Sequence, residues 1–187
     1  MLNELRPDFA GFIFAPSKRQ ISLEQALEIR AALDEAIPAV GVFVNEPIEN
    51  IVAIVESRAI QIVQLHGDED NAYREELGKW ITLPIIKAVA VKDAADVKKA
   101  YAADILLYDT YQSGVAGGTG KTFNWDLLKE ATQPFFLAGG LHAGNLEGAI
   151  KQMQPYAVDI SSGVEADGVK DFEKIRAVME IIGRSKK

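Results

Sequence analysis

Groups suited to acid–base chemistry lie directly after short apolar runs of this sequence. Asp109 ends the run DILLYD and precedes a long glycine-rich segment, while Gln64 and His66 lie at the end of IVQLH. Burial beneath a loop favours the neutral form of a carboxyl group, and a neutral carboxyl can act as a general acid. From position alone, Asp109 as a turn cap and His66 as a structural histidine remain open alternatives.

A basic pair follows the first apolar run. Lys18 and Arg19 come soon after Phe14 in the stretch APSKRQIS. The guanidinium of an arginine donates two parallel hydrogen bonds to a planar carboxylate, which makes Arg19 a candidate for binding a carboxylate ligand. A solvated basic turn is the competing interpretation, and from composition alone it is the more frequent one.

Two late apolar runs are followed by small residues. LAGGL contributes Gly139 and Gly140, and DISSGVE contributes Ser162 and Gly163. Backbone N–H groups in such turns bind phosphate, commonly after the last two strands of a (β/α)8 barrel. We therefore expect a phosphate site at these four residues, with plain strand-to-helix turns as the alternative.

The segment GTGKT at residues 118–122 resembles part of a nucleotide-binding phosphate loop. That motif requires a glycine five residues before Gly120, where this sequence has Val115. A loop that closes over a ligand, with Gly117, Gly118 and Gly120 giving it conformational freedom, is the favoured interpretation.

These groups must be positioned by an alternation of short apolar runs and longer amphipathic stretches. Such runs are typical of buried parallel strands, and the alternation indicates βαβ units. Polar or glycine-rich residues after nearly every run favour a barrel over an open sheet. Strands are predicted at 9–14, 39–44, 62–65, 84–91, 104–108, 134–138 and 157–161. Helices are predicted at 23–36, 47–57, 70–79, 93–102, 125–130, 143–152 and 171–183. Ser22, with Gln25 three residues on, is expected to cap the first of them in a capping box.

The composition limits the classes of partner. The chain has 187 residues, of which 48% are hydrophobic, and no linker divides it, so residues 1–187 are expected to form a single domain. A net charge of −7 disfavours general attraction to nucleic acid or to an anionic membrane. The chain lacks cysteine, an apolar run long enough to cross a membrane, and a signal-peptide pattern. We expect a soluble cytoplasmic protein.

Taken in order, the segments FIFAPSKRQIS, VGVFVNE, VQLHGDE, LLYDT, GGTGKTFNW, FFLAGGL and VDISSGVE closely resemble the phosphoribosylanthranilate isomerase family. The resemblance covers essentially the whole chain. It implies an α/β fold of the TIM (β/α)8-barrel type and a role in tryptophan biosynthesis. The implied reaction is an Amadori rearrangement of N-(5-phosphoribosyl)anthranilate to 1-(o-carboxyphenylamino)-1-deoxyribulose 5-phosphate.

The resemblance also implies roles for single residues. Asp109 matches the general acid, and Arg19 matches the arginine that holds the anthranilate carboxylate. The turns at Gly139–Gly140 and Ser162–Gly163 match the phosphate site, and Gln64 and His66 are expected to contact the substrate. Proton transfers suffice for the reaction, so no metal or organic cofactor is expected. The expected partner is the small-molecule substrate, bound by a monomer or a homodimer.

The sequence departs from the family pattern at its start. Family members begin with a strand that carries a cysteine as the general base, and this chain opens with LNELRPDFAGFIF and has no cysteine. We therefore expect the first strand, most of the first helix and the general base to be missing. The alternative function is a truncated phosphosugar-binding remnant with little or no catalysis. A barrel acting on another phosphosugar is a further alternative, which Arg19 and the QLHG segment disfavour.

Overall fold

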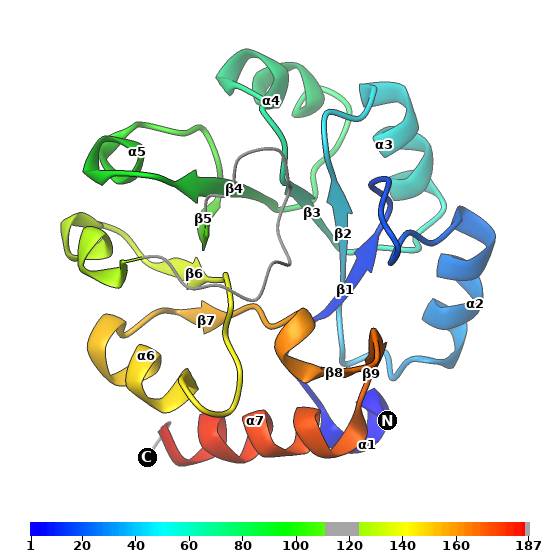
Figure 1. Ribbon diagram of the computed structural model, residues 1–187. Helices are drawn as coiled ribbons and strands as arrows, with labels where there is room; N and C mark the ends of the chain where they lie inside the picture. The colour runs from blue at the N-terminus through cyan, green and yellow to red at the C-terminus, as the bar shows by residue number, and fades with distance from the viewer. Residues whose placement is uncertain (111–123, 186–187) are drawn as a thin grey trace. The chain divides into compact units, whose positions relative to one another are not determined.

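The computed structural model describes residues 1–110 and 124–185 (Figure 1). The chain divides into two compact units. Unit 1 consists of residues 1–88 and 101–104, and unit 2 of the described residues in 89–100 and 105–187. The expected closing loop, with Gly117, Gly118 and Gly120, lies outside the described residues. The expectation of a single domain over 1–187 stays a prediction.

Unit 1 alternates strands and helices as the apolar pattern predicts. Strands β1 to β4 pair in chain order and run parallel, so that Phe12 lies beside Gly41 and Gly41 beside Val63. Parallel pairing requires a crossover between successive strands, and α2, α3 and α4 provide the crossovers. The elements are α1 (Leu2–Leu5), β1 (Ala10–Ile13), α2 (Leu23–Ala32), β2 (Ala39–Phe43), α3 (Ile48–Glu56), β3 (Ile62–Leu65), α4 (Asn71–Leu77) and the first part of β4 (Ile85–Val91).

Helix α2 shows how local sequence sets an element's bounds. Ser22 and Gln25 form the predicted capping box, in which the Ser22 hydroxyl accepts from the Gln25 N–H and the Gln25 amide oxygen accepts from the Ser22 N–H. The helix ends at Ala32, four residues before the predicted end, because Leu33 is extended. The Arg30 guanidinium then donates to the carbonyls of residues 33, 34 and 37, which satisfies backbone acceptors after the helix end.

The core of unit 1 lies between its sheet and its helices. Figure 1 shows α2, α3 and α4 along the same side of strands β1 to β3. Phe14 and Phe43 stack with ring centroids 5.2 Å apart, and Ile51 and Leu77 from the helices have no exposed surface. Burial on both faces explains why the strands are continuous apolar runs without polar alternation.

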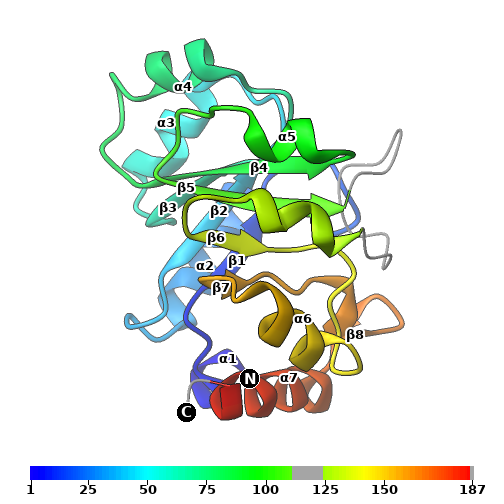
Figure 2. The same cartoon turned by 90° about the vertical axis from the view of Figure 1, so that its left-hand side faces the viewer.

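Unit 2 has the same alternation with shorter elements. Strands β5, β6 and β7 pair in parallel, with Tyr108 beside Leu137 and Leu137 beside Val158. Figure 2 shows α6 next to α7, and the two helices are in contact. The elements are the end of β4, α5 (Ala94–Lys98), β5 (Ile105–Thr110), η1 (Trp125–Glu130), β6 (Phe135–Leu137), α6 (Leu146–Met153), β7 (Ala157–Val158), η2 (Ser162–Val164), β8 (Glu165–Ala166), β9 (Val169–Lys170) and α7 (Phe172–Ser185).

All seven predicted strands are confirmed, although β6 and β7 are shorter than expected. The predicted helices exist, and all but one have changed bounds; α5, for example, ends early because Lys99 is extended. The helix predicted at 125–130 keeps its bounds and is the 3-10 helix η1. The antiparallel hairpin β8–β9 was not predicted. Its turn has positive φ at Asp167 (51°) and Gly168 (81°), which is typical of an Asp-Gly hairpin turn. In the described part of the chain, no helix is long and apolar enough to span a membrane.

We predict that Ser22→Ala lowers the free energy of unfolding by about 1 kcal/mol, because the Gln25 N–H loses its capping acceptor. Chemical denaturation followed by circular dichroism measures this change. Ser185→Ala, at the exposed end of α7, is the control and should stay within about 0.5 kcal/mol. Equal effects of the two substitutions would contradict the capping role.

Candidate active site

Arg19 lies in the loop that follows β1, as predicted. Three hydrogen bonds fix the backbone around it: Ile21 N–H donates to the Ile13 carbonyl (2.9 Å), Gln20 N–H to the Ser17 carbonyl (3.1 Å) and the Gln20 amide to the Phe14 carbonyl (2.9 Å). Arg19 is half-buried while Lys18 is exposed. The structure therefore holds the guanidinium-bearing residue at the carboxyl end of a buried strand.

Gln64 and His66 interact at the end of β3. The Gln64 amide nitrogen lies 2.8 Å from His66 Nδ1, and the His66 N–H donates to the Phe43 carbonyl at 2.8 Å. When the amide nitrogen donates, Nδ1 accepts and the ring carries its proton on Nε2. Gln64 is buried and His66 is half-buried, so the pair reaches from the sheet towards its edge.

A buried ion pair that was not predicted supports the turn after His66. Lys87 Nζ lies 2.9 Å from a carboxylate oxygen of Glu69, and the two side chains are only 8% and 1% exposed. Lys87 also donates to the Gly67 carbonyl (2.6 Å), while Glu69 accepts from the N–H groups of Gly67 (2.9 Å) and Asn45 (2.7 Å). The N–H and the carbonyl of Gly67 are therefore both hydrogen-bonded to buried charged side chains.

The ion pair lies on the opposite face of the sheet from Gln64. Gln64 neighbours Ile86 in the register, and Leu65 neighbours Lys87, so Gln64 and Lys87 point to opposite faces. Lys87 thus contacts the loop after His66 from the helix side of the sheet, and the Gln64 side chain lies on the other face. A lysine inside the apolar run PIIKAVAV is unusual, and this was the signal in the sequence that could have revealed the pair.

Close packing explains why residue 67 is glycine. A Cβ atom there would lie 2.5 Å from the side-chain oxygen of Asn45, which itself accepts from the Asp68 N–H. Tyr73 donates its hydroxyl to the Glu46 carbonyl beside this cluster. Burial, and then the charges of Glu69 and the other nearby glutamates, raise the pKa of Tyr73 to about 12. Tyr73 therefore stays a neutral donor near neutral pH.

In unit 2, Asp109 lies near the end of β5 and is buried. Tyr108 pairs with Leu137, and the Ala138 N–H donates to the Tyr108 carbonyl at 2.8 Å. Asp109 is therefore level with Ala138, one residue before the first glycine of the Gly139–Gly140 turn. A buried carboxyl group at the carboxyl end of a strand has the position that the sequence predicted.

The Gly139–Gly140 turn requires glycine at both positions. Gly139 has φ 86° and Gly140 has φ 64°, a region that favours glycine. Asn145, which was not predicted as a site residue, holds this turn: its amide donates to the Gly140 carbonyl (3.0 Å) and accepts from the His142 N–H (2.9 Å). Asn145 therefore links the turn to the start of α6.

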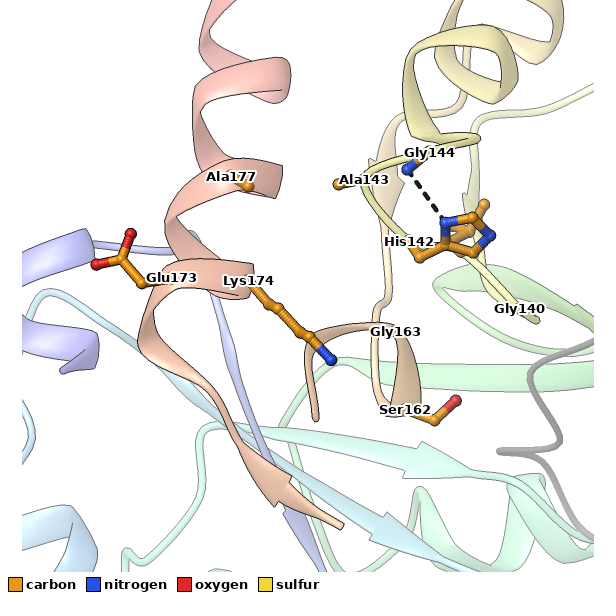
Figure 3. Close-up of a pocket in the computed structure, with 10 residues that line it drawn as sticks. Gly140, His142, Ala143, Gly144, Ser162, Gly163, Glu173, Lys174 and Ala177 are labelled. Carbon is orange, nitrogen blue, oxygen red and sulfur yellow. Dashed lines mark hydrogen bonds between the residues drawn. The ribbon is translucent and has the colours of Figure 1, made fainter. Parts of the chain in front are cut away.

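The Ser162–Gly163 turn packs against Leu141, the residue that follows the Gly139–Gly140 turn. A Cβ atom on Gly163 would lie 1.9 Å from the Leu141 carbonyl oxygen, so only glycine fits this approach. Both turns border one cavity of about 680 Å³. Figure 3 shows Lys174 extending from α7 towards the Ser162–Gly163 turn, while Glu173 points away from it. The predicted phosphate residues Gly140, Ser162 and Gly163 are thus brought together.

The second histidine, His142, lies at the surface. His142 is exposed, and its Nδ1 accepts a hydrogen bond from the Gly144 N–H at 3.1 Å (Figure 3). Among residues 1–110 and 124–185, no group of three or more His, Cys, Asp or Glu side chains is placed to hold a metal ion.

Comparisons with known proteins agree across the chain. A family model for N-(5'phosphoribosyl)anthranilate (PRA) isomerase matches residues 3–181. The N-(5'-phosphoribosyl)anthranilate isomerase of Endomicrobium trichonymphae is 50% identical over 181 residues, covering 97% of this chain and 90% of that protein.

Two solved structures share the fold. Monomers generated from the dimeric phosphoribosylanthranilate isomerase of Thermotoga maritima match with a TM-score of 0.83 and 34% identity. A phosphoribosylanthranilate isomerase in complex with reduced 1-(o-carboxyphenylamino)-1-deoxyribulose 5-phosphate matches with a TM-score of 0.81 and 33% identity. Each match covers 97% of this chain and 90% of the other.

These findings correct one expectation. The predicted absence of the first strand and of most of the first helix is not supported, because the matches extend over nearly the whole length of the relatives. The expectation rested on the absence of one short cysteine-bearing segment. The strand and helix pattern of the rest of the chain could not test it.

We predict that Lys87→Met lowers the free energy of unfolding by about 3–5 kcal/mol, because it leaves the Glu69 carboxylate buried without its cation. The matched control is Lys79→Met, which breaks an exposed pair with Glu76 and should cost less than about 1 kcal/mol. Urea unfolding measures both.

The double variant Lys87→Met/Glu69→Gln should recover part of the loss, since it removes the uncompensated charge. A Lys87→Met effect no larger than that of Lys79→Met would show that the ion pair does not support this loop.

Proposed function

Because the chain belongs to the N-(5'-phosphoribosyl)anthranilate isomerase family, we propose that it converts N-(5'-phosphoribosyl)anthranilate to 1-(o-carboxyphenylamino)-1-deoxyribulose 5-phosphate in tryptophan biosynthesis. The observation that carries the proposal is the meeting of the two small-residue turns at one cavity. The bound reduced product of the solved relative carries a phosphate, the group for which such turns are suited.

The reaction is an internal redistribution of protons and electrons. Protonation of the ribose ring oxygen breaks its bond to C1, and the lone pair of the anthranilate nitrogen forms a C1=N double bond. Removal of the C2 proton then gives an enolamine, which tautomerises to a C2 ketone with two hydrogens on C1. Substrate and product are isomers, so no redox partner or co-substrate takes part.

Asp109 is our proposed donor of the proton to the ring oxygen. Its buried position at the carboxyl end of β5 supports this role, because a general acid must be held within reach of the oxygen that it protonates. Asp109 also lies level with Ala138, one residue before the Gly139–Gly140 turn. This position supports the role, since a phosphate held at the turn would bring the ribose close to Asp109. The reacting ring lies within a few bonds of that phosphate.

Arg19, Gln64 and His66 are the proposed contacts to the other polar groups of the substrate. Arg19 would hold the anthranilate carboxylate through the two-pronged geometry of its guanidinium. Gln64 and His66 would contact the substrate as a pair, with His66 donating from Nε2 when Gln64 donates to Nδ1. The Glu69–Lys87 pair supports this role by fixing the backbone next to His66.

The phosphate would be bound by backbone N–H groups of Gly139, Gly140, Ser162 and Gly163. Glycine at three of these positions allows an anion to approach the backbone closely. The positive φ angles at Gly139 and Gly140 support this assignment, because such turns direct successive N–H groups to one concave side. The net charge of −7 makes local donors of this kind necessary.

The proton on C2 must be taken by a base. The family resemblance implies a cysteine for this step, and the 187 residues contain none. The cysteine is therefore not supplied by this sequence, and loss of a general base costs about 10²–10⁴-fold in rate. The alternative of a phosphosugar-binding remnant is less favoured, because the chain is similar over nearly its whole length to proteins named as isomerases.

We further propose a (β/α)8-type barrel that works in the cytoplasm as a monomer or homodimer. The strand and helix alternation and the TM-scores to solved isomerases support the barrel type. The dimeric state named for the Thermotoga maritima relative supports the homodimer. The cytoplasm is expected for an enzyme of amino-acid biosynthesis.

We predict that Asp109→Asn lowers kcat by about 10²–10⁴-fold, because an amide cannot donate the required proton. The assay follows the loss of anthranilate-type fluorescence from freshly generated substrate. Asp126→Asn, at an exposed residue of η1, is the control and should leave the rate unchanged.

Near-normal turnover by Asp109→Asn would reject Asp109 as the general acid. Absence of turnover in the unchanged chain, under conditions where a relative is active, would instead reject the isomerase function and favour the binding remnant.

A further inference from the structure

Lys170 lies at the end of the β8–β9 hairpin and reaches back to the Ser162–Gly163 turn. Its ammonium group donates to the Ser161 carbonyl at 2.8 Å and lies 3.5 Å from the Ser161 hydroxyl. It also pairs with Glu165, 3.0 Å away and directly opposite in the hairpin register. The Asp167–Gly168 turn makes this contact possible, because it returns the chain to the segment that precedes it.

We infer that Lys170 is a positioning residue for the phosphate site, which it organises by fixing the peptide group between Ser161 and Ser162. The inference deepens the proposed function and rests on it. In a planar trans peptide, the carbonyl and the following N–H point in opposite directions. A carbonyl of Ser161 held towards Lys170 therefore turns the Ser162 N–H away from Lys170.

The Ser161 carbonyl accepts from two donors, the Lys170 amine and the Val164 N–H. The hydrogen bond from the Val164 N–H to the Ser161 carbonyl measures 3.4 Å, which is long for an N–H donor. The charged amine at 2.8 Å is the stronger of the two interactions, since charge-assisted hydrogen bonds are shorter and stronger than neutral ones.

The two side chains of the pair differ in exposure. The Lys170 side chain is 43% exposed and that of Glu165 only 6%, so a Lys170 substitution alone leaves a nearly buried carboxylate without this cation. A double substitution that also neutralises Glu165 removes that charge and separates the local order of the Ser161–Ser162 peptide from global stability. In that background, loss of the fixed peptide orientation should appear as weaker binding of phosphate and not as unfolding.

The test uses inorganic phosphate as the probe and the amide resonances of Ser162 and Gly163 in the isotope-labelled full chain as the readout. Lys170→Met and Lys170→Gln should each weaken phosphate binding by about three- to tenfold, the range expected for one lost hydrogen bond. Lys170→Met/Glu165→Gln should bind phosphate as weakly as Lys170→Met while it recovers part of that variant's loss in melting temperature. Lys129→Met removes an exposed lysine paired with Asp126 and should bind phosphate normally.

Kinetics provide a second readout that a purely structural role would not reproduce. In the isomerase assay, both Lys170 variants should raise KM and leave kcat unchanged, because the phosphate is remote from the reacting bonds and contributes binding alone. Lys170→Arg keeps a charged donor and should restore much of the affinity.

Two outcomes overturn the inference, and they are distinguishable. If the Ser162 and Gly163 amides respond to phosphate and the Lys170 variants bind it as tightly as the unchanged chain, the positioning role is wrong and the phosphate site stands. If those amides do not respond in the unchanged chain, the proposed phosphate site fails and the role of Lys170 falls with it.

Discussion

Parallel pairing of successive strands is the constraint on which the placement of every candidate group depends. Within each unit, parallel strands must be joined by crossovers, so the loops that follow them emerge at one edge of the sheet. In unit 1 this edge holds Arg19 and His66, and in unit 2 it holds Asp109 and the two small-residue turns. Residues distant in sequence are gathered in each unit by strand direction alone.

Strand direction does not fix the conformation of the loops themselves. Side chains outside the ligand-facing positions perform that task in both units. Glu69 and Lys87 hold both backbone groups of Gly67 from the helix side of the sheet, and Asn145 holds the Gly140 carbonyl. Each satisfies a backbone group that would otherwise have to find a partner at a crowded strand end. Conformational order of the site and burial of polar groups are therefore achieved by the same contacts.

Much of the fold could be predicted because its signals are local. The seven apolar runs predicted the strands, the Ser22 and Gln25 spacing predicted a capping box, and paired glycines predicted the turn at Gly139. The end of α2 was missed because it depends on Arg30 binding carbonyls beyond the helix. The β8–β9 hairpin was missed because its strands are two residues each, too short for an alternation pattern.

The positions of the candidate site residues were predictable where residue type and strand position coincide, as for Asp109 and Gly163. The supporting residues were not, since Glu69, Lys87, Asn145 and Lys170 act through contacts between segments that lie apart in sequence or in a turn of unforeseen shape. A buried lysine in an apolar run was visible in the sequence, but its partner was not. The face of the sheet on which this lysine lies, and so the groups it contacts, depend on the register of β3 with β4.

A crystal structure of the chain with reduced 1-(o-carboxyphenylamino)-1-deoxyribulose 5-phosphate tests most directly whether the two small-residue turns bind the substrate's phosphate. We predict the phosphate within hydrogen-bond distance, about 2.7–3.2 Å, of backbone nitrogens in the Gly139–Gly140 and Ser162–Gly163 turns. A phosphate bound elsewhere, with these N–H groups facing solvent, would contradict this assignment.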